Sequence, residues 1–213
     1  MKFSITDERE VKKFFIIFYV VGIIGMAIPY TLPLFKILTP YALVLSFGYL
    51  AYFHPTKKNT TSNILFFFIF LAGLVVEIIG VKTGVIFGGY EYGNSLGMKV
   101  FDTPLLIGIN WLFLVYTTAC MVDKTKWHAV LKIVVAASGM LVYDIVLEQV
   151  APKMDMWSWQ NNVVPIQNYI AWFVIAAFFH SLLKIFKVKL SNPLAAHIIA
   201  CQFVFFVVLL FLL

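Results

Sequence analysis

The sequence predicts an all-α protein, a polytopic membrane bundle of about seven transmembrane helices. Of its 213 residues, 62% are hydrophobic and only 12% are charged, whereas about a quarter of the residues in a soluble domain are charged. A helix needs roughly 20 apolar residues to cross about 30 Å of hydrocarbon, and seven stretches of about that length follow one another along the chain. We therefore expect a single integral membrane domain, residues 1–213.

Each predicted span is an apolar run bounded by polar or charged segments. In chain order the spans are Phe14–Leu32, Ile37–His54, Ile64–Val81, Pro104–Val122, Trp127–Leu147, Ile166–Phe186 and Pro193–Leu213. The first span follows the charged segment "TDEREVKK" and lacks a cleavage site of small residues, so we expect a retained helix and not a signal peptide. Cys120 and Cys201 lie in apolar spans and fit small core residues.

Basic residues between the spans predict the orientation of the bundle. Ten lie on the N-terminal face, namely Lys2, Arg9, Lys12, Lys13, Lys57, Lys58, Lys124, Lys126, Lys187 and Lys189. The other face has three, Lys82, Lys99 and Lys153. Because cytoplasmic loops carry the excess of Lys and Arg, we expect a multi-pass protein of the cell (inner or cytoplasmic) membrane with its N-terminus in the cytoplasm. The net charge of +6 is therefore a topology signal and does not indicate nucleic-acid binding.

The ends of four predicted helices bring polar side chains to the face opposite the N-terminus. These side chains are Glu77, Asn110, Trp111, Asp144, Glu148, Gln167 and Asn168. The longest loop, "VKTGVIFGGYEYGNSLGMKVFD", lies on the same face and is rich in glycine and aromatic residues. A carboxylate within a membrane span is costly unless it is neutral or paired, so it is a functional candidate by default. We therefore expect a site at this face.

The carboxyl groups also allow structural interpretations. Glu77 and Asp144 fit salt bridges to Lys82 or Lys99, and Glu148 fits a marker of the membrane surface. As site residues, Glu77 and Asp144 lie near helix C-termini, where the helix dipole disfavours negative charge. We expect such a group to be a neutral acid that can donate a proton.

Other polar residues have similar alternatives. Asp102 precedes Thr-Pro and fits the N-cap of the fourth helix. Gln202, alone in the last span, fits an interhelical hydrogen bond. The aromatic residues near the expected site also fit a belt at the membrane interface; they are Tyr90, Tyr92, Trp157 and Trp159.

Several classes of membrane protein are excluded by missing residues. The four histidines lie near the cytoplasmic helix ends and form no His-x-x-His or Glu-x-x-His array, so we expect no metal. The last span has no lysine for a retinal Schiff base. No nucleotide-binding loop is present, and we expect no cofactor.

Four segments between Leu71 and Trp172 resemble the membrane carotenoid hydratase family of the CruF and bisanhydrobacterioruberin hydratase type. They are "VEIIGVKTGVIFGGYEYGNSLG", "PLLIGINW", "YDIVLEQVAPKMDMWSW" and "VPIQNYIAW". The resemblance implies addition of water to the terminal C=C bond of an acyclic carotene end group, as in lycopene, gamma-carotene or bisanhydrobacterioruberin, giving a tertiary hydroxyl without a cofactor. The matching positions are Glu77, Gly84, Phe87, Gly88, Tyr90, Tyr92, Trp111, Asp144, Trp157, Trp159, Asn168 and Trp172. In that family the acid near the end of the fifth helix is followed at once by Pro, whereas "EQVAP" separates Glu148 from Pro152 here.

The resemblance and the polar cluster together predict a site that uses a carotenoid from the bilayer and water. Its expected catalytic residues are Glu77, Asp144, Asn168 and Glu148, and its expected substrate contacts are Tyr90, Tyr92, Asn110, Trp111, Trp157, Trp159 and Trp172. Asp144 or Glu77 would protonate the alkene, and aromatic faces would stabilise the cation. The other carboxylate, with Asn168 or Asn110, would hold the water. A carotenoid end-group cyclase and a small proton-coupled transporter are the alternatives.

Overall fold

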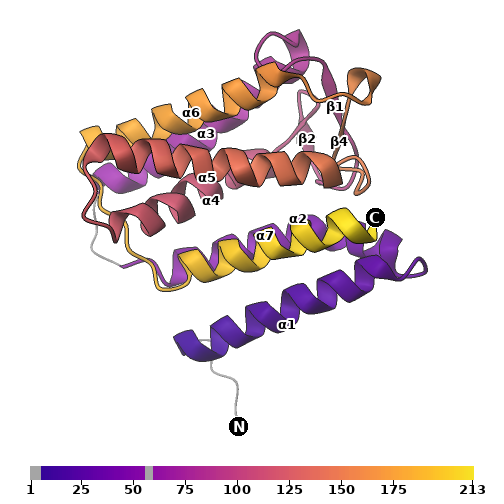
Figure 1. Cartoon of the computed structure of the whole chain (residues 1–213), viewed down its shortest axis with the longest axis horizontal. Coiled ribbons are helices and arrows are strands. Elements are labelled where there is room, and N and C mark those ends of the chain that lie inside the picture. The colour runs from indigo at the N-terminus through magenta and orange to yellow at the C-terminus, as the bar shows by residue number, and fades with distance from the viewer. Residues whose placement is uncertain (1–5, 56–59) are drawn as a thin grey trace.

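The computed structural model describes residues 6–55 and 60–213 and contains seven long helices within them (Figure 1). The helices are α1 (Glu8–Ala27), α2 (Leu32–Tyr52), α3 (Thr60–Thr83), α4 (Leu106–Asp123), α5 (Ala129–Val150), α6 (Ile166–Ile185) and α7 (Ala195–Leu212). Six of them, α2 to α7, are long and apolar enough to cross a membrane. The predicted all-α polytopic bundle is confirmed. Lys2, Lys57 and Lys58 lie outside the described residues.

The first predicted boundary is wrong because prolines divide the chain earlier than expected. α1 begins in the charged segment and ends at Ala27, because Ile28 is extended and precedes Pro29. α2 then begins at Leu32, five residues before the expected start at Ile37, with Pro33 in its first turn, where proline needs no hydrogen-bond partner. The predicted span Phe14–Leu32 was therefore too long at its C-terminal end.

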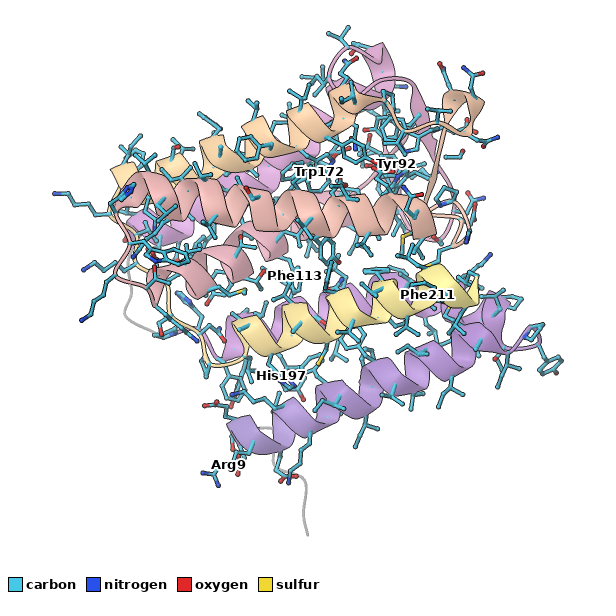
Figure 2. The ribbon with its side chains drawn as sticks, in the orientation of Figure 1. Arg9, Tyr92, Phe113, Trp172, His197 and Phe211 are labelled. Atoms are coloured by element: carbon cyan, nitrogen blue, oxygen red, sulfur yellow. The ribbon has the colours of Figure 1, made fainter. Side chains whose placement is uncertain are left out.

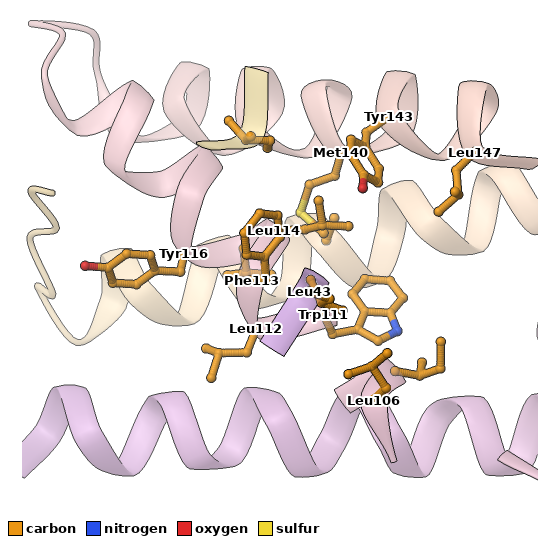
Figure 3. Packing of buried hydrophobic residues seen from close by; sticks show 14 of the residues in the cluster. Leu43, Leu106, Trp111, Leu112, Phe113, Leu114, Tyr116, Met140, Tyr143 and Leu147 are labelled. Carbon is orange, nitrogen blue, oxygen red and sulfur yellow. The ribbon is translucent and has the colours of Figure 1, made fainter. Parts of the chain in front are cut away.

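The helices form two adjoining groups with α4 at the centre (Figure 1). α3, α4, α5 and α6 pack together, while α7 connects α4 and α5 to α1, and α2 packs on α1 and α4. Most residues of α4 are buried, and Figure 3 shows Trp111, Phe113 and Leu114 in the core that surrounds it. Small residues allow α3 and α4 to approach closely: a Cβ added at Gly73 would lie 2.7 Å from the Cβ of Trp111.

Two short antiparallel ribbons lie at one end of the bundle. β1 (Tyr90–Tyr92) pairs with β4 (Trp157–Trp159), and β2 (Lys99–Val100) pairs with β3 (Thr103–Pro104). Alternate residues of a strand face opposite sides, so the tyrosines of β1 and the tryptophans of β4 are buried while Glu91 is exposed. The β1–β4 ribbon therefore turns four aromatic side chains toward the helices.

Candidate active site

Glu77, near the C-terminal end of α3, accepts three hydrogen bonds in the interior of the protein. The hydroxyl groups of Tyr90 and Tyr92 donate to its Oε2 over 2.6 and 2.7 Å. Trp111 Nε1 on α4 donates to its Oε1 over 3.0 Å. Only 4% of Glu77 is exposed. Both of its oxygens are therefore held by donors from the β1 loop and α4.

The nearby lysines bind other partners, so the salt-bridge interpretation of Glu77 is wrong. Lys82 pairs with Asp102, and Lys99 Nζ donates to the carbonyl oxygen of Tyr92 over 2.6 Å. Asp102 is exposed and has φ 65° in the turn between β2 and β3, a conformation that aspartate tolerates. The N-cap interpretation of Asp102 is also wrong, because Leu105 occupies that position without a side-chain cap. The hydrogen bond and charge of Lys82 lower the pKa of Asp102.

Glu148, near the end of α5, also accepts three hydrogen bonds. Trp157 Nε1 and Trp159 Nε1 donate to its Oε2 over 2.9 and 2.5 Å. Asn168 Nδ2 on α6 donates to its Oε1 over 3.2 Å. Because only 4% of Glu148 is exposed, its interpretation as a marker of the membrane surface is wrong. The belt interpretation of the four ribbon aromatics is wrong too, since each is buried and donates to a carboxyl group.

Asp144 lies one helical turn before Glu148 on the same face of α5 and shares a donor with it. Asn168 Nδ2 donates to Asp144 Oδ2 over 3.1 Å as well as to Glu148. Asp144 is fully buried, and its Oδ1 has no hydrogen-bond partner among the described residues. Two buried carboxyl groups repel each other if both are charged. The shared amide of Asn168 therefore links two carboxyl groups whose mutual repulsion is relieved when one of them is neutral.

A cavity of about 20 Å³ lies between Glu77 and Glu148. A buried cavity needs roughly 10–15 Å³ to hold one water molecule, so this space fits one. Its walls are formed by Glu77, Phe87, Tyr90, Tyr92, Ile107, Asn110, Glu148, Trp157, Trp159, Asn168 and Trp172. Trp172 stacks on Trp111 with ring centroids 4.2 Å apart. Figure 2 shows Tyr92 and Trp172 on the inner side of the group formed by α3 to α6.

A larger chamber of about 290 Å³ adjoins this cavity and is almost entirely apolar. The two spaces share three wall residues, Ile107, Asn110 and Trp157. The remaining walls come mainly from α1, α2, α5 and α7. The site therefore combines a polar cavity the size of one water molecule with an apolar chamber that borders it.

The environment of the two tyrosines keeps them as hydrogen-bond donors. Burial disfavours the phenolate form and raises the pKa of both Tyr90 and Tyr92 above the ordinary value, and the charge of the neighbouring Glu77 raises it further. Both hydroxyl groups are thus neutral near pH 7 and can donate to Glu77.

The structure brings together almost all of the residues that the sequence pointed to. Every expected catalytic residue and substrate contact except Asp144 either lines the cavity or donates a hydrogen bond to a carboxyl group that lines it. Asp144 does not line the cavity and contacts it through Asn168. Gln167 is exposed and binds the carbonyl oxygen of Val85, so it is not part of the site. Sequence reasoning missed Ile107, whose apolar side chain gave no signal apart from its position one turn before Asn110.

Comparison with known protein families identifies the family of the chain. Among the described residues, no group of three or more His, Cys, Asp or Glu side chains is placed to hold a metal ion. No curated protein and no solved structure matches the chain. A family model described as carotenoid biosynthesis protein matches residues 17–213, nearly the whole sequence. The chain therefore belongs to the carotenoid biosynthesis protein family.

Proposed function

We propose that the protein is a cofactor-independent carotenoid hydratase of the cytoplasmic membrane. It would add water to the terminal C=C bond of an acyclic carotene end group and produce a tertiary alcohol. The observation that carries this proposal is the cavity the size of one water molecule between Glu77 and Glu148, beside an apolar chamber. Hydration of an alkene needs these elements: an acid, a base, one water and an apolar place for the hydrocarbon.

The proposed reaction proceeds through a tertiary cation. A carboxylic acid transfers its proton to the less substituted carbon of the terminal C=C bond, and the π electrons of that bond form the new C–H bond. The more substituted carbon becomes the tertiary cation. The cationic carbon then accepts a lone pair from water, and a carboxylate takes the proton that this water loses. One water is consumed and no electrons are exchanged. Before the next turnover, the carboxyl group that acted as the base must return its proton to the one that acted as the acid.

The contacts of the two glutamates favour Glu148 as the acid and Glu77 as the base. Glu148 accepts a hydrogen bond from Trp157, which borders both the cavity and the chamber, whereas none of the three donors to Glu77 lines the chamber. Both glutamates accept three hydrogen bonds, but the donors to Glu77 bind no other carboxyl group among the described residues, whereas Glu148 shares Asn168 with the buried Asp144. Glu77 is therefore the better supported as a charged carboxylate, and Glu148 the better placed to hold a proton. Both groups line the same cavity, so one water can carry the proton from Glu77 back to Glu148.

Aromatic faces beside the cavity would stabilise the cation. Tyr90 lies 5.0 Å from Trp159 and Tyr92 lies 6.0 Å from Trp157, measured between ring centroids. A desolvated cation over such a ring gains about 2 kcal/mol. Asp144 would act as a positioning residue, because it reaches the cavity only through Asn168.

Isotope labelling tests the proposal. The protein is expressed in a host that makes lycopene, and its membranes are supplied with oxygen-18 water or with labelled dioxygen. We expect a product heavier than lycopene by one water, with the label arriving from water and with turnover that continues without oxygen. Label from dioxygen would refute the hydratase proposal. A product of unchanged mass would indicate a cyclase, and uptake into vesicles without any product would indicate a transporter.

A further inference from the structure

Two polar atoms of the apolar chamber lack partners among the described residues. The hydroxyl oxygen of Tyr143 on α5 and Oε1 of Gln202 on α7 are both buried, and both residues line the chamber. Tyr143 is 3% exposed and Gln202 is 7% exposed. Figure 3 shows the Tyr143 ring extending from α5 between Met140 and Leu147. Neither residue belongs to the cavity between the glutamates.

Unpartnered buried polar atoms are uncommon, and each destabilises the protein unless a partner binds. The Tyr143 hydroxyl and the Gln202 side-chain amide are neighbours close to hydrogen-bonding contact, yet their geometry falls short of a hydrogen bond. Tyr19, which lines the same chamber, differs from them because its hydroxyl is 3.0 Å from Ser46 Oγ and is therefore satisfied. Both atoms lie just beneath the chamber surface, so the chamber borders one adjacent pair of polar groups that a third group can reach when the two side chains rotate toward it.

We propose that Tyr143 and Gln202 form a subsite for the hydroxyl group of an alcohol-bearing carotenoid, an inference that rests on the proposed carotenoid ligand. A hydroxyl group both donates and accepts hydrogen bonds. It can donate to Gln202 Oε1 and accept from the Tyr143 hydroxyl, so one ligand atom satisfies both groups. A hydrocarbon carotene can satisfy neither.

The position of the pair limits the sources of this hydroxyl. Tyr143 lies five residues before Glu148 on α5, which is about 7.5 Å along the helix axis. Because Tyr143 also does not line the cavity between the glutamates, an oxygen bound at its hydroxyl is not in the position where water is added. The alcohol is either the enzyme's own product, after it has moved into the chamber, or a carotenoid that another enzyme has hydroxylated.

Ligand binding to the full chain in phosphatidylcholine nanodiscs tests the subsite. The polyene quenches tryptophan fluorescence, and three probes are compared: lycopene, its mono-hydrated tertiary alcohol, and a carotenoid with a secondary hydroxyl on an end ring. Because the hydroxyl gains up to two hydrogen bonds in the chamber, we expect the tertiary alcohol to bind about tenfold more tightly than lycopene. In the Tyr143→Phe, Gln202→Leu double variant, the ratio of the affinity for the tertiary alcohol to the affinity for lycopene should fall to about one.

Tyr19→Phe is the matched control. It also removes a tyrosine hydroxyl from the chamber wall, but this hydroxyl already has a hydrogen-bond partner, Ser46. We expect it to lower the melting temperature of the ligand-free protein and to leave the binding ratio unchanged. Tyr143→Phe should leave the melting temperature unchanged or raise it. Preference for the tertiary alcohol alone would identify the product as the ligand, and equal preference for both alcohols would identify any hydroxylated carotenoid.

Two results would overturn the subsite. One is a wild-type ratio near one, and the other is a ratio that persists in the double variant. A lower melting temperature of Tyr143→Phe, together with a wild-type affinity ratio near one, would show that Tyr143 and Gln202 already have hydrogen-bond partners within the protein. The binding signal is read before any alcohol forms from lycopene, which extraction of the same sample verifies. Failure of the subsite is therefore distinguishable from failure of the hydratase proposal, which the oxygen label tests alone.

Discussion

The three buried carboxyl groups at the site differ in their hydrogen bonds. Among the described residues, Glu77 and Glu148 each accept three hydrogen bonds, whereas Asp144 accepts one and its Oδ1 has no partner. The donors to the two glutamates are side chains that packing holds in place; Trp111, for example, stacks on Trp172. Such fixed donors hold the glutamates in one orientation. Asp144 lacks this support and does not line the cavity, so we assign it an indirect role.

Isosteric replacement of the glutamates tests these roles. General acids and bases typically contribute roughly 10²- to 10⁴-fold each, so we expect Glu77→Gln and Glu148→Gln each to lower the hydration rate by that order. Asp144→Asn should have a smaller effect, because the residue acts through Asn168. The rate is measured in membranes as alcohol formed per amount of protein. Glu91→Gln, which changes an exposed carboxylate in the same loop region, should retain the wild-type rate.

Two outcomes would contradict this assignment. Wild-type rates in both glutamine variants would show that neither glutamate transfers a proton. An Asp144→Asn rate as low as that of Glu148→Gln would place the reactive proton on Asp144.

The sequence was sufficient to find the carboxyl groups but not their partners. Glu77, Asp144 and Glu148 stand out because charge is costly in an apolar helix, and the helical period places Asp144 and Glu148 on one face. Trp157, Trp159 and Asn168 were expected at the site, but their hydrogen bonds to Glu148 were not predictable, because the position of the two tryptophans depends on the pairing of β4 with β1. That pairing joins Tyr90 to Trp159, residues far apart in the chain, and short strands of three residues carry little periodic signal.

At the scale of single elements, the helices were predictable and the ribbons were not. Long apolar runs set the helices, and the errors arose at Pro29 and Pro33, where the turn between α1 and α2 comes earlier than hydropathy alone suggests. The Asp-Thr-Pro sequence suggested a helix cap at Asp102. Aspartate is also suited to turns with positive φ, and the β2–β3 turn uses it in that way.

The junction between β1 and the loop before β4 should be sensitive to small changes. Gly93 N donates to Met156 O over 2.9 Å, and a Cβ at Gly93 would lie 2.2 Å from the backbone oxygen of Asp155. In Gly93→Ala the two segments must separate by about 1 Å, a displacement that can lower catalysis about 10²-fold. We expect a loss of that order in the hydration rate of membrane-inserted protein.

Gly97→Ala provides the comparison for this variant. Gly97 has φ 79°, but nothing lies within 4 Å of an added Cβ. The change should therefore cost only the backbone strain of about 1–2 kcal/mol and lower the melting temperature without a comparable loss of rate. Equal losses of rate in the two variants would mean that the Gly93 contact does not position the ribbon.

At the scale of the whole molecule, the chamber lies where the two groups of helices meet. Its walls include Phe18 of α1, Phe35 of α2 and Phe205 of α7 on one side, and Leu147 of α5 on the other. The helices of both groups expose apolar side chains on their outer faces, as expected for contact with lipid. A carotene dissolved in the bilayer would therefore reach the glutamates by passing between these groups.

The final prediction concerns the side of the membrane on which the reaction occurs. In Figure 1 the loop between α4 and α5 and the C-terminus lie at opposite ends of the bundle, and the β1–β4 ribbon lies at the end with the C-terminus. Because the excess of basic residues lies on the face of the α4–α5 loop, the positive-inside rule places that loop in the cytoplasm. A reporter inserted between Lys124 and Lys126 should be cytoplasmic, and one fused after Leu213 should be exterior. Both signals in reverse would keep the site intact but place its water supply on the cytoplasmic side, and two signals on one side would contradict the predicted number of membrane crossings.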